Sequence, residues 1–124
     1  MKVMIVEDHT SMRRILNAIV SISFTESVDV IECENAEEGV EQYMATKPDC
    51  ILMDFELPNM NGLEATEKIL EKDSNAKIIF VTSYDSPSFR QKVESLPVLG
   101  LISKDNLSEV IPILSSLSSQ TNTL

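Results

Sequence analysis

The sequence predicts an α/β fold with a parallel sheet of five strands. Residues 3–6, 50–53 and 77–81 are strongly apolar, as is typical of parallel strands that helices cover on both faces. Residues 28–33 and 98–102 are further candidate strands, and amphipathic segments of helical periodicity separate all five. Strands that alternate with helices in this way are joined by crossover connections, which indicate a doubly wound sandwich.

Composition limits the function classes. The chain of 124 residues is long enough for one domain, and its 43% of hydrophobic residues argue against disorder. The formal net charge of −10 argues against nucleic acid or an anionic membrane as a partner, because phosphates would repel the domain. Cys33 and Cys50 fall in predicted strands without a signal peptide, which indicates buried thiols in a reducing cytoplasm. We expect the domain to span residues 1–118 and residues 119–124, rich in Ser, Thr and Asn, to form a flexible tail.

The first helix is expected over residues 11–23. Its apolar face is predicted to consist of Met12, Ile15, Leu16, Ile19 and Ile22. Arg13 and Arg14 are expected to lie outside this face. The strand that follows alternates in part, which suits the edge of a sheet better than its centre.

Start signals mark the second and third helices. Asn35 followed by Glu38, and Asn61 followed by Glu64, each match a capping box, in which the two side chains satisfy free backbone amides of the first turn. Pro48 follows the second helix and is expected to stop it.

Proline positions define the last two helices. Ser86 as N-cap and Pro87 at the first helical position begin the fourth helix. In the fifth, Ser108 as N-cap would place Pro112 within about the first turn, whereas a start at Asn106 would give a kink at that proline.

Polar side chains follow the strands at one edge of the predicted sheet. Glu7 and Asp8 follow the first strand, Asp54 the third, Thr82 the fourth and Lys104 the fifth. Because the carboxyl ends of parallel strands share one rim, these groups are expected to converge. Three carboxylates in one place favour a divalent cation, and oxygen ligands favour Mg²⁺, with Mn²⁺ as a substitute, over zinc. Asp54 is then a candidate nucleophile that forms an acyl phosphate.

The whole chain resembles the receiver domain of two-component response regulators, of the kind found in chemotaxis. The resemblance rests on the five rim residues in their order and on Pro58 and Gly62, four and eight residues after Asp54. It implies a flavodoxin-like (βα)5 fold with strand order 2-1-3-4-5. It also implies a signalling switch, not an enzyme, in which Asp54 accepts a phosphoryl group from a histidine kinase or phosphotransfer protein and loses it by slow self-catalysed hydrolysis.

The resemblance also implies a set of cation ligands. Asp8 and Asp54 resemble direct Mg²⁺ ligands of the family. Glu7 would act through water, and the glutamate in place of the aspartate that many members carry there keeps the charge and suits a ligand of this kind. The backbone carbonyl of Glu56 would complete the protein's share.

The resemblance implies switch residues as well. Thr82 and Lys104 match the residues that contact the phosphoryl group. Glu56 and Tyr84, two residues after the acceptor and after Thr82, would flank the attacking water and tune the lifetime of the phosphorylated state. Leu101 occupies the position of the usual Tyr or Phe, three residues before Lys104, which puts the aromatic part of the family's switch in doubt.

The resemblance places the signalling face on helix four, strand five and helix five. There Pro97, Val98 and Leu99 form either an exposed apolar patch for a protein target or homodimer, or part of the core. Asp105 replaces a frequent proline, so no cis peptide is expected after Lys104. His9 is expected to be a solvated loop residue and no metal ligand, because no second His or Cys lies near it.

Two other function classes stay open. A phosphohydrolase that forms an aspartyl phosphate needs an acid or base two residues after its nucleophile, and Glu56 is there. However, Pro58 occupies the position of the hydroxyl residue that such a motif carries next. An interaction module with a vestigial site is disfavoured, because all the acceptor residues are present.

Overall fold

The five strands form one parallel sheet in the order β2-β1-β3-β4-β5. The computed structural model describes the backbone of residues 1–121 and the side chains of residues 1–118. The strands are β1 (Lys2–Val6), β2 (Asp29–Cys33), β3 (Cys50–Met53), β4 (Ile78–Thr82) and β5 (Gly100–Ser103). The predicted doubly wound fold and its strand order are therefore confirmed.

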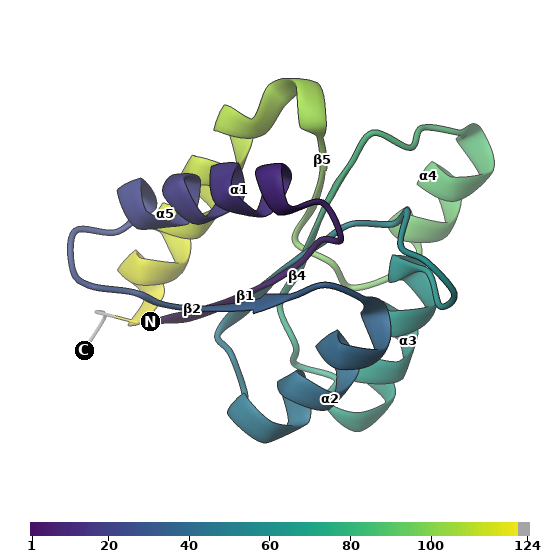
Figure 1. Ribbon diagram of the computed structural model, residues 1–124, viewed down its shortest axis with the longest axis horizontal. Helices are drawn as coiled ribbons and strands as arrows, with labels where there is room; N and C mark the ends of the chain where they lie inside the picture. The colour runs from purple at the N-terminus through teal and green to yellow at the C-terminus, as the bar shows by residue number, and fades with distance from the viewer. Residues whose placement is uncertain (122–124) are drawn as a thin grey trace.

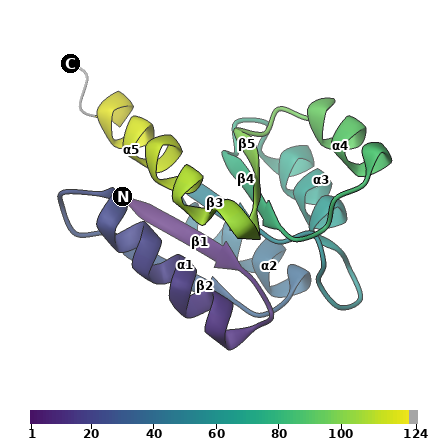
Figure 2. The ribbon, with the colours of Figure 1, turned by 90° about the horizontal axis from the view of Figure 1, so that it is seen from above.

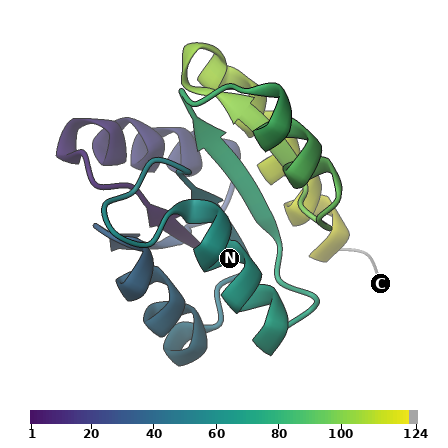
Figure 3. The ribbon, with the colours of Figure 1, turned by 90° about the vertical axis from the view of Figure 1, so that its right-hand side faces the viewer.

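Helices cover both faces of the sheet (Figure 1). They are α1 (Thr10–Ser23), α2 (Ala36–Thr46), α3 (Gly62–Lys72), α4 (Pro87–Glu94), the 3₁₀ helix η1 (Lys104–Glu109) and α5 (Val110–Thr121). Helices α1 and α5 pack on one face, and α2, α3 and α4 pack on the other. Figure 2 shows α1 and α5 together on their side of the sheet, and Figure 3 shows α3 and α4 nearest the viewer. Among residues 1–121, no helix is long and apolar enough to cross a bilayer.

Each central strand contributes to two cores, because its side chains alternate between the faces. In β1, Val3 and Ile5 pack against α1 and α5, whereas Met4 and Val6 pack on the side of α2 to α4. All four are completely buried. This arrangement explains why the strand is apolar at every position.

The predicted inner face of α1 is partly wrong. Ile15 and Ile22 are 47% and 71% exposed, and the residues that face the sheet include Leu16 and Val20. Arg13, expected outside, is buried. Arg13 lies about one helical turn before Leu16 and two before Val20, so all three side chains are on the same side of α1. There the backbone carbonyl of Glu7, just after β1, accepts a hydrogen bond from the guanidinium.

The helix starts follow the predicted caps. The side chains of Asn35 and Asn61 accept hydrogen bonds from the backbone amides three residues on, at 2.8 and 2.9 Å. The reciprocal half of the first capping box differs, because the Glu38 carboxylate accepts from the amide of Glu34, 3.4 Å away. Ser86 caps α4 through the amide of Phe89 at 3.2 Å.

The C-terminal elements differ slightly from expectation. Strand β5 begins at Gly100, not at 98, and η1 precedes α5. Helix α5 starts at Val110, so Pro112 lies in its first turn, as predicted. Because α5 continues to Thr121, the first three residues of the predicted tail have helical backbone, and residues 122–124 lie outside the described part of the chain.

Candidate functional site

The loop after β3 holds Asp54 in a close-packed turn. Asp54 is 3% exposed, and its backbone amide donates to the carbonyl of Val6, 3.1 Å away, at the end of β1. Gly62, at the start of α3, donates its amide to the carbonyl of Phe55 at 2.9 Å. A Cβ atom at Gly62 would lie 1.9 Å from the carbonyl oxygen of Asp54. The glycine eight residues after Asp54 is therefore required by the close approach of α3 to the loop that carries Asp54.

The Lys104 ammonium joins acids from two other strands. Its Nζ lies 3.0 Å from Oδ2 of Asp54 and 2.7 Å from Oε1 of Glu7. Glu7 is completely buried, so its charge is shielded very little by water. Burial acts to lower the Lys104 pKa, but the contacts with Glu7 and Asp54 outweigh it and raise the pKa above its ordinary value. Glu7, Asp54 and Lys104, which follow β1, β3 and β5, thus meet at one point as predicted.

Glu7, Asp8 and His9 bring three ligand atoms together beside this ion pair. One ligand atom from each residue lies within 4.8 Å of the other two. The His9 amide donates to Oε2 of Glu7 at 3.1 Å, and its Nδ1 lies 3.2 Å from the same oxygen. Nδ1 is also 3.3 Å from Oδ1 of Asp8. His9 is exposed, as predicted, but its ring is held against both acids.

The acidic pair fits a divalent cation. Oδ1 of Asp8 is a buried oxygen that accepts no hydrogen bond from the described residues, and Oε1 of Glu7, equally buried, is met by Lys104 alone in the ion pair above. Buried carboxylate oxygens without donors are costly unless a cation satisfies them. Carboxylate oxygens are the ligands that Mg²⁺ prefers.

The Thr82 side chain is held by the loop that follows β4. Thr82 is 2% exposed, and its Oγ1 accepts a hydrogen bond from the amide of Tyr84 at 3.1 Å. The Tyr84 ring packs on Phe55, with centroids 4.5 Å apart, and on Phe89 of α4, at 5.2 Å. Phe55 and Phe89 are also in contact, at 4.5 Å. These three rings, here called the aromatic cluster, connect the residue after Asp54 to α4.

Leu101 occupies the sheet position next to this cluster. It is partly buried, packs against the core on the side of α2 to α4, and pairs with Phe80 in the sheet register. A small cavity of about 40 Å³ has Thr82, Tyr84 and Leu101 among its lining residues. At this position β5 supplies a leucine and no aromatic ring, so the rings around the loop after Thr82 are those of the aromatic cluster.

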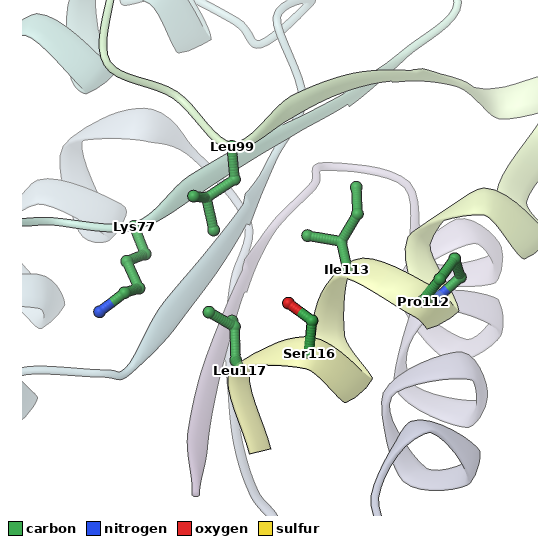
Figure 4. Close-up of a pocket in the computed structure, with 6 residues that line it drawn as sticks. All are labelled: Lys77, Leu99, Pro112, Ile113, Ser116 and Leu117. Carbon is green, nitrogen blue, oxygen red and sulfur yellow. The ribbon is translucent and has the colours of Figure 1, made fainter. Parts of the chain in front are cut away.

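The three residues of the predicted output patch have different environments. Pro97 is exposed, whereas Val98 is half-buried against the core. Leu99 is 41% exposed and lines a groove of about 380 Å³ beside α5. Figure 4 shows Leu99 facing Ile113 and Leu117 across this groove. The backbone after Lys104 has no cis peptide among the described residues, as expected.

Several contributors were not foreseen in the sequence. Arg13 donates to the backbone carbonyl of Glu7 at 2.8 Å and pairs with Glu32 and Glu34 at 3.4 Å each. The signal that could have identified it is its spacing of three from Leu16, on the buried side of the helix. The ring contacts of Phe55 gave no comparable signal, because they join residues that lie far apart in the sequence, one in the loop after β4 and one in α4.

Comparisons with known proteins agree with the geometry. The family described as "Response regulator receiver domain" matches residues 3–114. A "Chemotaxis protein CheY" of Thermotoga maritima is 41% identical over 78 residues, which cover 63% of this chain and 63% of that protein. A protein of the same name from Halobacterium salinarum is 37% identical over 103 residues, or 83% of each chain.

A solved structure agrees with the fold over the whole chain. The response regulator domain of Thermotoga maritima CheB superposes with a TM-score of 0.80 at 26% identity, covering 100% of this chain and 98% of that one. Longer proteins also match: the transcriptional regulatory protein YdfI of Bacillus subtilis is 34% identical over 89% of this chain, which spans 51% of that protein's length. The chain belongs to the family of response regulator receiver domains of two-component signalling.

Proposed function

We propose that the protein is a phosphorylation-activated switch in which Asp54 accepts a phosphoryl group from a histidine kinase or a histidine phosphotransfer protein. The observation that carries the proposal is the Lys104 ammonium, which lies within 3.0 Å of Asp54 and 2.7 Å of Glu7 at the carboxyl edge of the sheet. A buried acid beside a fixed cation is suited to phosphoryl transfer, in which positioning and charge neutralisation carry most of the catalysis.

The transfer itself is a single displacement. A carboxylate oxygen of Asp54 attacks the phosphorus of a phosphohistidine, the N–P bond breaks, and the electron pair returns to the donor imidazole. One carboxylate oxygen of Asp54 accepts from the amide of Glu56 at 3.2 Å and the other from Lys104. These contacts orient the acid, and Lys104 is placed to neutralise charge on the phosphoryl oxygens.

A divalent cation would supply further charge neutralisation between the acids and the phosphoryl oxygens. We assign Asp8 and Asp54 as direct ligands, Glu7 as a ligand through water and the backbone carbonyl of Glu56 as a fourth contributor, with Mg²⁺ as the ion. The buried oxygen of Asp8 without a hydrogen bond supports this assignment.

The switch is proposed to start at Thr82. Its hydroxyl accepts from the amide of Tyr84 in the structure described here, and it would turn toward the phosphoryl group once Asp54 is modified. Any displacement of Oγ1 perturbs this bond, and Tyr84 in turn packs on Phe55 and Phe89. The aromatic cluster then transmits the change to α4, while Leu101 repacks without a ring.

We further propose how the phosphorylated state ends and which surface it changes. Slow self-catalysed hydrolysis would release phosphate, with the exposed side chains of Glu56 and Tyr84 beside the path of the attacking water. The output surface would comprise α4, β5 and α5, with Pro97 and Leu99 exposed for a target protein or a second copy. The two buried free cysteines support a location in the cytoplasm.

Labelling by a small phosphodonor tests this function. Acetyl phosphate with Mg²⁺ should add one phosphoryl group to the protein, measured as intact mass, and nothing to Asp54→Asn. Asp105→Asn, an exposed acid close to Lys104 in sequence, is the matched control and should be labelled normally. Equal labelling of Asp54→Asn would place the acceptor elsewhere, and steady release of phosphate over many turnovers would favour a phosphohydrolase.

A further inference from the structure

We propose that His9 is a nitrogen ligand of the cation site, so that the site binds borderline transition ions of the Zn²⁺ class more tightly than an all-oxygen site would. The inference rests on the proposed function, because that function requires the cation site. It adds one ligand to the site from the acidic loop, here defined as Glu7, Asp8 and His9. The carrying observation is the Nδ1 atom of His9, which lies 3.2 Å from Glu7 and 3.3 Å from Asp8.

These separations are those of neighbouring ligands on one ion. Ligands about 2.1 Å from a tetrahedral ion lie about 3.4 Å apart, and ligands at the same distance around an octahedral ion lie about 3.0 Å apart. The two distances from Nδ1 lie between these values. The separation between His9 and Asp8 is therefore compatible with direct binding of one ion by both, while Glu7, whose Oε2 accepts from the His9 amide, stays a ligand through water.

The Asp8 oxygen that faces His9 is available to an ion, whereas Oε2 of Glu7 already accepts from the His9 amide. Oδ1 of Asp8 is buried and accepts no hydrogen bond from the residues that the structure describes. The two oxygens of Glu7 are divided between neighbours, because Oε1 faces Lys104 while Oε2 faces His9. The His9 side chain itself is 71% exposed, so an ion can reach it from solvent.

The backbone holds His9 beside Glu7. The His9 amide donates to Oε2 of Glu7, and this short local turn keeps the ring beside the same oxygen. His9 is also the residue that precedes α1, at its N-cap position, where the backbone is fixed in an extended conformation. Orientation of this kind reduces the entropy lost when the ring binds an ion.

The nitrogen ligand predicts a change of ion preference. Imidazole binds zinc, copper, nickel and iron, whereas Mg²⁺ prefers oxygen ligands. Loss of His9 should therefore weaken Zn²⁺ binding and leave Mg²⁺ binding nearly unchanged. A site made only of carboxylates would show the same change, or none, for both ions.

The experiment is nitrogen NMR on protein labelled with ¹⁵N-histidine and carrying no affinity tag. His9 is the single histidine of the chain, so every imidazole signal belongs to it. Zn²⁺ should shift the Nδ1 resonance far more than the Nε2 resonance, and an equal amount of Mg²⁺ should not. Asp8→Asn should abolish the shift if His9 and Asp8 hold the same ion.

Calorimetry with each ion supplies a second readout, on the unphosphorylated protein. His9→Gln should weaken Zn²⁺ binding about tenfold or more while changing Mg²⁺ binding less than about twofold. Competing zinc sites at the cysteines are not expected, because Cys33 and Cys50 are completely buried and burial raises the pKa of each thiol to about 12.

Two results would overturn the inference. One is a Zn²⁺ complex in which Nδ1 does not shift, and the other is an unchanged Zn²⁺ affinity in His9→Gln. Neither measurement uses a phosphodonor. A failure here therefore leaves Mg²⁺-dependent labelling of Asp54 as a separate result, and a failure of that labelling leaves the zinc measurements unaffected.

Discussion

At the scale of single residues, the site depends on the charge of Lys104. Glu7 is completely buried, and a buried carboxylate is stable only when it is paired and hydrogen-bonded. Lys104 supplies that pairing at 2.7 Å and contacts Asp54 at the same time. The residue proposed to bind the phosphoryl group is therefore also a stabilising residue of the unphosphorylated fold.

Lys104→Met is expected to destabilise the protein by up to about 3 kcal/mol, because it leaves the charge of Glu7 buried and unpaired. Urea denaturation at neutral pH measures this change in the free energy of unfolding. Lys77→Met, which removes an exposed lysine, is the matched control and should change it by less than about 0.5 kcal/mol. Equal stability of the two variants would show that the ion pair contributes little.

The Lys104 contribution should also depend on pH. Its pKa in the folded protein is raised above the unfolded value, so the contribution is fully present below the unfolded pKa and is lost as pH rises through the folded pKa. The difference in unfolding free energy between the wild type and Lys104→Met should then be constant at neutral pH and shrink in strongly alkaline solution. The buried thiols titrate in both proteins, so their effect cancels in this difference. A difference that grows with alkaline pH would contradict the assignment.

At the scale of elements, α1 is attached to the acidic loop by a buried arginine. Arg13 donates to the backbone carbonyl of Glu7 at 2.8 Å and pairs with Glu32 and Glu34 near the end of β2. The helix therefore fixes the position of the residue that precedes Asp8. The exposed Arg14 has a different environment, which makes the pair a controlled comparison.

Arg13→Leu is expected to cost about 1–3 kcal/mol of unfolding free energy, because it removes the donor to a buried carbonyl. Arg14→Leu should cost less than about 0.5 kcal/mol. Chemical denaturation of both variants measures the comparison. If the two substitutions had equal effects, the buried contacts of Arg13 would not contribute to stability.

The aromatic cluster allows the proposed switch to be tested by fluorescence. The chain has no tryptophan and two tyrosines, so Tyr43→Phe leaves Tyr84 as the main intrinsic fluorophore. Beryllofluoride with Mg²⁺, which mimics an acyl phosphate, should change the Tyr84 emission as its amide loses the bond to Thr82. Thr82→Ala in the same background should reduce the change. No response despite beryllofluoride binding, checked by fluorine NMR, would exclude a role of Tyr84 in the switch.

At the scale of the whole molecule, patterns within single segments predicted the fold well. The two-sided apolar runs of β1, β3 and β4 identified buried parallel strands, and the caps at Asn35 and Asn61 located two helices. The convergence of Glu7, Asp54 and Lys104 followed from the common edge of such a sheet. These features depend on local periodicity and on one topological rule.

Features that depend on packing between distant segments were not predictable. Ile15 and Ile22 looked like core residues, but the turn of α1 against the sheet exposes them and buries Arg13. The contact of His9 with two acids depends on the backbone path between β1 and α1. The sequence prediction missed this contact, because it looked for a second His or Cys near His9 and not for acids. The strand order itself came from the family resemblance.

The groove between Leu99 and α5 gives a prediction about association. Leu99 is 41% exposed, so Leu99→Asp should leave the fold intact, whereas Val98→Asp places a charge in the half-buried position and should destabilise it. If the proposed output face mediates self-association after phosphorylation, Leu99→Asp should weaken the dimer seen by light scattering with beryllofluoride. An unaffected dimer would place the interface elsewhere.

The most direct test of the central claim is chemical mapping of the modified residue. After treatment with acetyl phosphate and Mg²⁺, borohydride reduces an aspartyl phosphate to homoserine, which peptide mass spectrometry locates. The account predicts homoserine at position 54 alone, and none when EDTA removes the cation. Modification at another acid, or modification at Asp54 that does not need a divalent cation, would contradict it.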